Sequence, residues 1–211
     1  MLDILTFRVL SGILLAASVL LLVLARRRPS EERTPYVAAA VRHVPRALHI
    51  VWLTVSVLVL LAAILAAVVA PQLIYLTPLN LSFPGSVYLQ LAGFILFGVG
   101  GAIILWSDWH LGRFMVVDIA VARDHQLITT GPYAYVRHPT YTGVLLLNLA
   151  AAVFFLHAVL IVNFFLVLAI ASWRAKLEEE LLSSEQGFGI RYREYVSQTG
   201  RFLPRSFRGF E

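Results

Sequence analysis

Long stretches without a formal charge are the feature that most constrains this chain. A helix crosses a hydrocarbon layer about 30 Å thick with roughly 20 apolar residues, because each residue advances about 1.5 Å. Three such stretches stand out at residues 13–25, with a mixed lead-in from residue 4, at residues 47–70 and at residues 87–106. Hydrophobic residues make up 59% of the chain and charged residues only 14%, unlike a soluble globular domain. These features predict an all-α integral membrane protein.

A fourth uncharged stretch, residues 141–173, is longer than the others at 33 residues if His157 is neutral. That length exceeds one crossing but is short for two perpendicular crossings and a loop. We therefore expect a tight helical hairpin with its turn near His157 and with Asn163 close by, where neighbouring helices satisfy the polar groups. The chain is thus predicted to have about five transmembrane helices, the last two forming the hairpin. A cleaved signal peptide is disfavoured, because the basic cluster Arg26-Arg27-Arg28 follows the first apolar stretch.

The basic residues between these stretches predict the orientation of the chain. The connection at residues 26–46 carries six Arg, whereas the connection at residues 71–86 carries no charged residue. Residues 107–140 and the tail after residue 173 also contain Arg. Because Lys and Arg are retained on the cytoplasmic side, we expect an outside N-terminus and a cytoplasmic location for all the basic segments.

The net charge of +5 could suggest nucleic acid as a partner. The basic residues, however, lie beside the apolar stretches and not on one soluble face, so anionic membrane lipid is the expected partner. The chain has no cysteine, which excludes disulfides and thiol chemistry, and we predict no metal site. We expect residues 1–70 to form a two-span scaffold with a basic cytoplasmic connector, and residues 71–211 to form a catalytic membrane core.

Polar residues suited to chemistry are concentrated at residues 118–141 and 174–204. Within the first segment, Gly131-Pro132 interrupts the chain, and Pro139 biases His138 away from a helix while suiting the first turn of the next one. Backbone amides freed by such a loop can bind a carboxylate, and Tyr and His side chains can border a purine or ribose. The same Arg, His and Tyr residues could instead form an interfacial belt that anchors helices at headgroup level. Residue types alone leave both interpretations open.

Three motifs in this part of the chain indicate a family. They are Leu127-Ile128-x-x-Gly131-x-Tyr133, Arg137-His138-Pro139-x-Tyr141-x-Gly143, and a tail with Glu178-Glu179-Glu180, Phe188-Gly189-x-x-Tyr192-x-x-Tyr195 and Arg201-Phe202-x-Pro204. In this order, separated by an apolar hairpin, they resemble the isoprenylcysteine carboxyl methyltransferase family and its phospholipid methyltransferase relatives from roughly residue 116 to 204. The resemblance implies an all-helical membrane fold with S-adenosylmethionine as cofactor in a cytoplasm-facing pocket. In agreement, no glycine-rich turn lies between a strand and a helix as in a Rossmann site.

The resemblance also implies which residues line the cofactor pocket. Asp118 is included because it falls where relatives carry a polar cofactor contact such as Gln, although the residue type differs here. The full implied set is Asp118, His125, Gln126, Leu127, Ile128, Gly131, Tyr133, Arg137, His138, Pro139, Thr140, Tyr141 and Glu178.

Arg174 and Glu178 are the expected catalytic residues. They are four apart and therefore lie on one helix face, where they could also form an ordinary interfacial ion pair. The family pattern gives the Arg to the substrate carboxylate and the Glu to the cofactor pocket. Aligning the tail on Phe188-Gly189 selects Lys176 and Glu180 instead. We prefer Arg174 with Glu178, because Arg can bind a carboxylate through two hydrogen bonds.

The resemblance implies methyl transfer to a lipophilic small-molecule substrate, with carboxyl O-methylation of a prenylcysteine-like lipid as the leading interpretation. A phospholipid N-methyltransferase or a small-thiol S-methyltransferase shares the same cofactor motifs. An NADPH-dependent sterol-type reductase is a more distant alternative, because such proteins carry a similar His-x-x-Tyr-x-Gly motif. A non-enzymatic helical scaffold is the remaining alternative.

Overall fold

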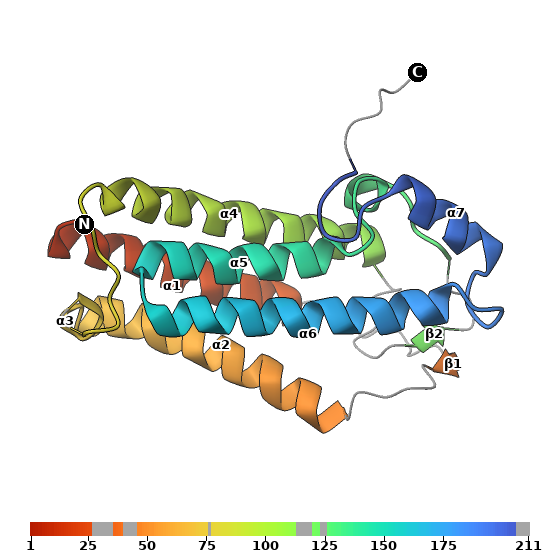
Figure 1. Ribbon diagram of the computed structural model, residues 1–211, viewed down its shortest axis with the longest axis horizontal. Helices are drawn as coiled ribbons and strands as arrows, with labels where there is room; N and C mark the ends of the chain where they lie inside the picture. Colours follow the sequence, from red (N-terminus) through yellow and green to blue (C-terminus); the bar gives the residue numbers. More distant parts are fainter. Residues whose placement is uncertain (27–35, 40–45, 76, 113–119, 123–125, 206–211) are drawn as a thin grey trace, which may run out of the picture. The chain divides into compact units, whose positions relative to one another are not determined.

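The computed structural model describes residues 1–26, 36–39, 46–75, 77–112, 120–122 and 126–205, and it is mainly helical (Figure 1). Two short strands, β1 and β2, pair antiparallel. The elements in chain order are α1 (Ile4–Arg26), β1 (Tyr36–Ala39), α2 (Arg46–Val69), α3 (Gln72–Tyr75), α4 (Ser86–Leu111), β2 (Ala120–Ala122), the 3₁₀ helix η2 (Gly131–Ala134), α5 (Pro139–Phe155), α6 (Ala158–Leu182) and α7 (Ile190–Gln198).

The chain divides into two compact units. The apolar unit comprises Met1–Arg28, Pro45–Gly101 and Val144–Ala169, and the polar unit comprises Pro29–Val44, Ala102–Gly143 and Ile170–Glu211. The apolar unit contains most of the hydrophobic core. The polar unit contains the first residues of α5, the last turns of α6 and all of α7.

Aromatic packing around Phe154 organises the apolar unit. The ring of Phe7 stacks on that of Phe154 with centroids 5.2 Å apart, and Phe155 meets both rings edge-on. A Cβ atom at Gly93 would lie 2.7 Å from the Phe154 backbone nitrogen, so only glycine permits this close approach of α4 to α5. The buried Gln90 side chain donates to the Phe154 carbonyl at 3.1 Å. The polar residue that interrupts the third apolar stretch is therefore satisfied by a neighbouring helix.

The helical hairpin predicted at residues 141–173 is confirmed. Helices α5 and α6 are separated by Leu156 and His157, and Leu156 has a positive φ of 48°. Loop residues 79–81 close the turn, because Leu81 donates its amide to Leu156 O at 2.8 Å and Ala158 donates to Leu79 O at 2.9 Å. Asn163 donates to the Asn148 side chain at 2.9 Å, so polar groups inside the hairpin bind one another.

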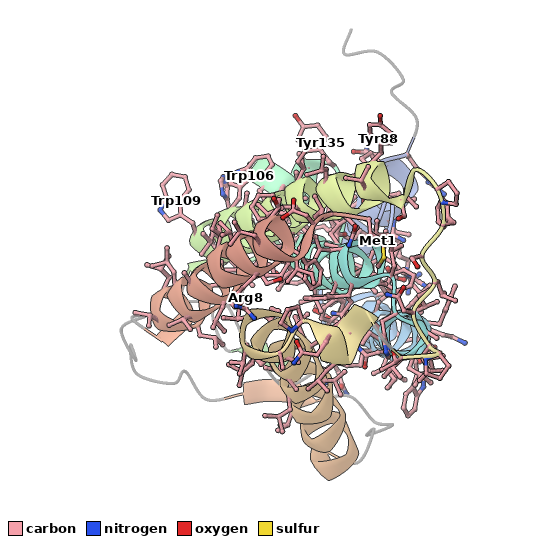
Figure 2. All side chains as sticks on the ribbon, turned by 90° about the vertical axis from the view of Figure 1, so that its left-hand side faces the viewer. Met1, Arg8, Tyr88, Trp106, Trp109 and Tyr135 are labelled. Atoms are coloured by element: carbon pink, nitrogen blue, oxygen red, sulfur yellow. The ribbon has the colours of Figure 1, made fainter. Side chains whose placement is uncertain are left out.

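The chain is an integral membrane protein. Among the described residues, three helices are long and apolar enough to cross a bilayer, Ile4–Leu24, Ser86–Leu111 and Ala158–Leu182, and shorter apolar helices cover Val57–Val69 and Pro139–Phe155. Figure 2 shows Trp106 and Trp109 pointing outward from the end of α4, and the Trp109 side chain is 80% exposed. Such tryptophans are typical of the membrane–water interface. The number of crossings and their orientation stay predictions.

Two helices extend beyond the predicted apolar stretches. Helix α4 continues past residue 106 to Leu111, and α6 continues past residue 173 to Leu182. The added residues of α6 are mainly Ala, Leu, Lys and Glu, which have high helix propensity, so the helix persists where the hydropathy falls. The expected cytoplasmic tail therefore begins as the end of α6. The small β1–β2 pair is a departure from a purely helical expectation, and its two apolar segments are too short to stand out in the hydropathy of the connections.

Candidate active site

The loop before α5 is shaped by glycine and proline, as the sequence indicates. Gly131 begins η2 with a φ of +59°, and a Cβ atom there would lie 2.2 Å from ring atoms of His110. Pro139 is the first residue of α5, a position that needs no backbone donor. Tyr133 and His138 are both buried. The loop is thus well packed and places His138 directly before the first residue of α5.

The chain after α7 pairs with this loop. Arg137 donates its amide to Gly200 O at 2.8 Å, and His138 donates its amide to Arg201 O at 3.1 Å. The Thr142 hydroxyl donates to Phe202 O at 2.9 Å. The tail segment, residues 199–202, therefore lies directly against the Arg137-His138-Pro139 motif.

Helix α7 is held to the same loop by its buried tyrosines. The Tyr195 hydroxyl donates to Tyr133 O at 2.5 Å. Burial raises the pKa of the Tyr195 phenol and of the Tyr192 phenol above the ordinary value, so both remain protonated donors over the physiological range. The spacing of these tyrosines, i and i+3, places them on one face of α7.

The Glu179 carboxylate contacts three basic side chains. Its Oε1 accepts from Arg137 Nε at 2.9 Å and lies 3.2 Å from His138 Nε2, and its Oε2 accepts from Arg201 Nη2 at 2.5 Å. The Glu179 side chain is 13% exposed and that of Arg137 is 9% exposed. Arg137 also donates to the carbonyls of Val196 and Thr199 at the end of α7. The cluster therefore joins the α5 motif, α6, α7 and the tail segment.

A second set of contacts centres on the Tyr141 hydroxyl. Tyr141 donates to Glu178 Oε2 at 3.2 Å and accepts from Arg174 Nε at 3.2 Å. The Tyr141 ring also stacks on the His138 ring, with centroids 5.3 Å apart and 6° between the planes. Glu178 is 35% exposed, and its Oε2 lies 3.7 Å from His138 Nδ1. Arg174, Tyr141, Glu178 and His138 thus form one connected group with an accessible carboxylate.

The residues of the alternative tail alignment lie elsewhere on α6. Lys176 and Glu180 are exposed, whereas Arg174 and Glu178 both meet Tyr141. The structure therefore brings together the preferred pair.

Other predicted pocket residues are less closely connected to this group. Gln126 is exposed, Ile128 and Thr140 are partly buried, and Leu127 lines an open groove of about 400 Å³ along α7 with residues that include Arg191, Glu194 and Gln198. Asp118 and His125 lie outside the described residues.

Glu179 and Arg201 were not among the predicted site residues. Glu179 belongs to a run of three Glu, where solvated side chains are the usual outcome. The Arg201-Phe202-x-Pro204 motif is the signal that could have identified the pair. If this motif packs near the Arg137-His138-Pro139 motif, its Arg needs an acidic partner there.

Comparison with known proteins finds sequences similar to this part of the chain. Residues 91–184 match the model of the isoprenylcysteine carboxyl methyltransferase (ICMT) family. The predicted resemblance is confirmed. Among curated relatives, protein-S-isoprenylcysteine O-methyltransferase of Xenopus laevis is 34% identical over 92 residues, and that of Tribolium castaneum is 32% identical over 94 residues. Each match covers 42% of this chain and 31% of the relative, so the chain matches less than a third of the length of these relatives.

A solved structure shares the fold. The eukaryotic intramembrane Ras methyltransferase, isoprenylcysteine carboxyl methyltransferase, matches with a TM-score of 0.53 at 18% identity. The match covers 81% of this chain and 56% of that one. The helical membrane fold expected from the motifs is therefore shared with a structurally characterised methyltransferase.

Proposed function

We propose that this chain is an S-adenosylmethionine-dependent methyltransferase that acts on a lipophilic substrate, by carboxyl O-methylation of a prenylcysteine-like lipid. The observation that carries the proposal is that Arg174 and Glu178 both form a hydrogen bond with the Tyr141 hydroxyl, each at 3.2 Å. This arrangement puts a cation and an anion side by side beside the Arg137-His138-Pro139 motif. The ICMT family match and the names of the curated relatives support the same activity.

The side chains of this site fit S-adenosylmethionine. That molecule offers an ammonium group and ribose hydroxyls as donors, together with an aromatic purine. The partly exposed Glu178 carboxylate can accept hydrogen bonds from the ammonium and hydroxyl groups, and the stacked rings of His138 and Tyr141 suit an aromatic or cationic group. We assign cofactor contacts to Glu178, Tyr141, His138 and the loop around Gly131, and extend them to the other residues carried over from the family. When bound, the cofactor supplies a methyl group already activated by its sulfonium.

Arg174 is the proposed substrate residue. A carboxylate acceptor is ionised at neutral pH and needs an orienting cation but no general base. The Arg174 guanidinium can bind such a carboxylate through two hydrogen bonds, and its bond to Tyr141 restrains its direction. The protein's contribution is then mainly orientation of donor and acceptor, which can account for much of the rate enhancement in a two-substrate reaction.

The proposal extends to the organisation of the chain. Residues 71–211 form the catalytic core and residues 1–70 the membrane scaffold, with the site facing the cytoplasm. A substrate with its lipid tail in the bilayer and its polar end at the interface then reaches the site laterally.

Calorimetry on detergent-solubilised protein tests the proposal with S-adenosylmethionine and NADPH as separate ligands. We expect binding of S-adenosylmethionine only, and weaker binding by at least about tenfold for Tyr141→Phe, which removes a hydroxyl that makes two hydrogen bonds. Tyr88→Phe is the matched control, because the Tyr88 side chain is 76% exposed. Absence of S-adenosylmethionine binding in the unmodified protein would defeat the proposal, and binding of NADPH would favour a reductase.

Methyl transfer to a prenylcysteine analogue and to a short-chain, water-soluble analogue tests the substrate class. We expect a strong preference for the prenylated acceptor, and equal efficiency on both would contradict lateral access. An amine or thiol acceptor is the second candidate, favoured by the 3.7 Å separation of Glu178 Oε2 and His138 Nδ1, a pair that could accept a proton. Faster transfer to a lipid amine or thiol than to the carboxylate would select it.

A further inference from the structure

The tail segment has no role in the function proposed above, yet it forms part of the immediate surroundings of His138. The backbone of the tail segment accepts hydrogen bonds from the amides of Arg137 and His138. The Phe202 ring lies 6.1 Å from the His138 ring at an angle of 61°, while Tyr141 stacks on the same imidazole. The imidazole of His138 therefore contacts aromatic rings from both α5 and the tail segment.

An ion pair fixes the tail segment to α6. Arg201 donates from Nη2 to Glu179 Oε2 at 2.5 Å and from Nε to Oε1 at 3.1 Å, so the guanidinium meets both carboxylate oxygens. Arg201 is 37% exposed and Glu179 13%, which places the pair at the edge of the polar unit with its anion shielded from solvent. Hydrogen bonds between charged groups of this kind are stronger and more directional than neutral ones.

The same carboxylate also determines the direction of the His138 ring. With His138 Nε2 at 3.2 Å from Glu179 Oε1, the other ring nitrogen, Nδ1, faces Glu178 at 3.7 Å. Loss of the Glu179 contact would remove the hydrogen bond that orients Nε2 of this ring. The stack on Tyr141 and the approach to Glu178 depend on that orientation.

We propose that Glu179 and Arg201 are positioning residues for methyl transfer: their ion pair holds the tail segment against His138 and so fixes the His138 ring against Tyr141. This inference rests on the proposed function, because it assigns His138 and Tyr141 to the cofactor. It adds two residues that act through His138 without touching the reacting groups.

Steady-state kinetics of Arg201→Ala tests the inference. We expect the KM for S-adenosylmethionine to rise by at least about tenfold, the effect of losing one strong polar interaction, while the KM for the prenylcysteine analogue changes by less than about twofold. Arg201→Lys should be intermediate, because a Lys ammonium cannot meet the two carboxylate oxygens in the same planar geometry. Glu179→Gln should follow Arg201→Ala, because it keeps the side-chain shape but removes the charge.

Arg193→Ala is the matched control. Arg193 also lies in the polar unit and donates from two guanidinium nitrogens, but to the Ser183 carbonyl and away from His138. Both KM values of this variant should equal those of the unmodified protein.

The split between the two KM values separates positioning from a purely structural role. A structural role lowers the fraction of active protein, and hence the apparent kcat, without changing either KM. Unchanged KM for S-adenosylmethionine in Arg201→Ala would therefore overturn the inference. If Arg201→Ala does not fold, Arg201→Lys decides, and its KM for S-adenosylmethionine should still rise by about threefold or more. Failure of the unmodified protein to bind S-adenosylmethionine would instead reject the proposed function.

Discussion

At the scale of single residues, Gly131 shows how tightly the loop before α5 is built. Its backbone has a φ of +59°, which costs a residue with a side chain about 1–2 kcal/mol, and a Cβ atom would also collide with His110. To make room, the His110 ring would have to turn and lose its 3.0 Å hydrogen bond with Trp106 O. A side chain at this position would therefore destabilise the protein twice, through backbone strain and through the lost hydrogen bond.

Gly131→Ala is expected to lower the free energy of unfolding by about 2–3 kcal/mol, the sum of backbone strain and one lost hydrogen bond. Reversible unfolding in mixed micelles measures this change. Gly112→Ala is the matched control, because Gly112 has a φ of +51° with open space around its Cβ position, so only the strain remains. The double variant His110→Ala, Gly131→Ala should lose less from the glycine substitution than Gly131→Ala does alone. Equal costs at Gly131 and Gly112 would contradict the collision.

Individual site residues differ in how far the sequence could predict them. His138 and Tyr141 belong to a short motif, so their proximity follows from local spacing along the start of α5. Arg174 and Glu178 approach Tyr141 only because α5 and α6 form a hairpin. That hairpin could be predicted from the length of the uncharged stretch. The Glu179–Arg201 pair joins residues 22 apart across a helix end and α7, and no local pattern encodes that pairing.

At the scale of elements, the α5–α6 hairpin is held by a polar contact between two apolar helices. Asn163 donates to Asn148 at 2.9 Å, and Asn148 donates in turn to the Val144 carbonyl. Both side chains are buried, at 8% exposure. In hydrocarbon, a polar group without such a partner is costly, so the contact favours one register of the two helices.

A double-mutant cycle with Asn148→Leu, Asn163→Leu and the double variant measures this contact. We expect a coupling energy of about 0.5–2 kcal/mol, the range found for hydrogen bonds between membrane helices. The double variant should lose less stability than the sum of the single variants, because it leaves neither amide unpaired. Additive losses would mean that the two side chains act independently. Gln90→Leu, in another helix pair of the apolar unit, should show no coupling with Asn163→Leu.

Hydropathy predicted the elements well where helices are apolar and less well where they end. The hairpin turn at His157 was predicted because the length of the uncharged stretch leaves few other positions. The continuation of α6 was expected only as far as the helix face shared by Arg174 and Glu178, and the extension of α4 past residue 106 was missed, because propensity and hydrogen bonding continue a helix after the hydrophobic signal has ended. The β1–β2 pair was missed because it links two short segments that are distant in the sequence.

At the scale of the whole molecule, the orientation in the membrane is a prediction from charge and has a direct test. The chain has no cysteine, so single-cysteine variants carry one reactive thiol each. Ser82 lies in the charge-free connection and Ser197 in α7, and both side chains are exposed. In right-side-out cells, an impermeant maleimide should label Ser82→Cys and label Ser197→Cys only after permeabilisation. The reverse pattern, or labelling of both, would refute a cytoplasm-facing site.

The fixation of the tail segment has a consequence for how sequence variation in this chain is interpreted. Arg201 lies after the end of α7, outside any helix or strand, where substitutions would ordinarily be regarded as neutral. Its partner Glu179 is the middle residue of a run of three Glu, where one Glu would ordinarily be regarded as equivalent to the next. Because the two side chains share two hydrogen-bonded contacts, a substitution at either position weakens the same link between α6 and the tail segment. The effect of a substitution at residue 201 therefore depends on the side chain at residue 179, and the two positions have to be interpreted together.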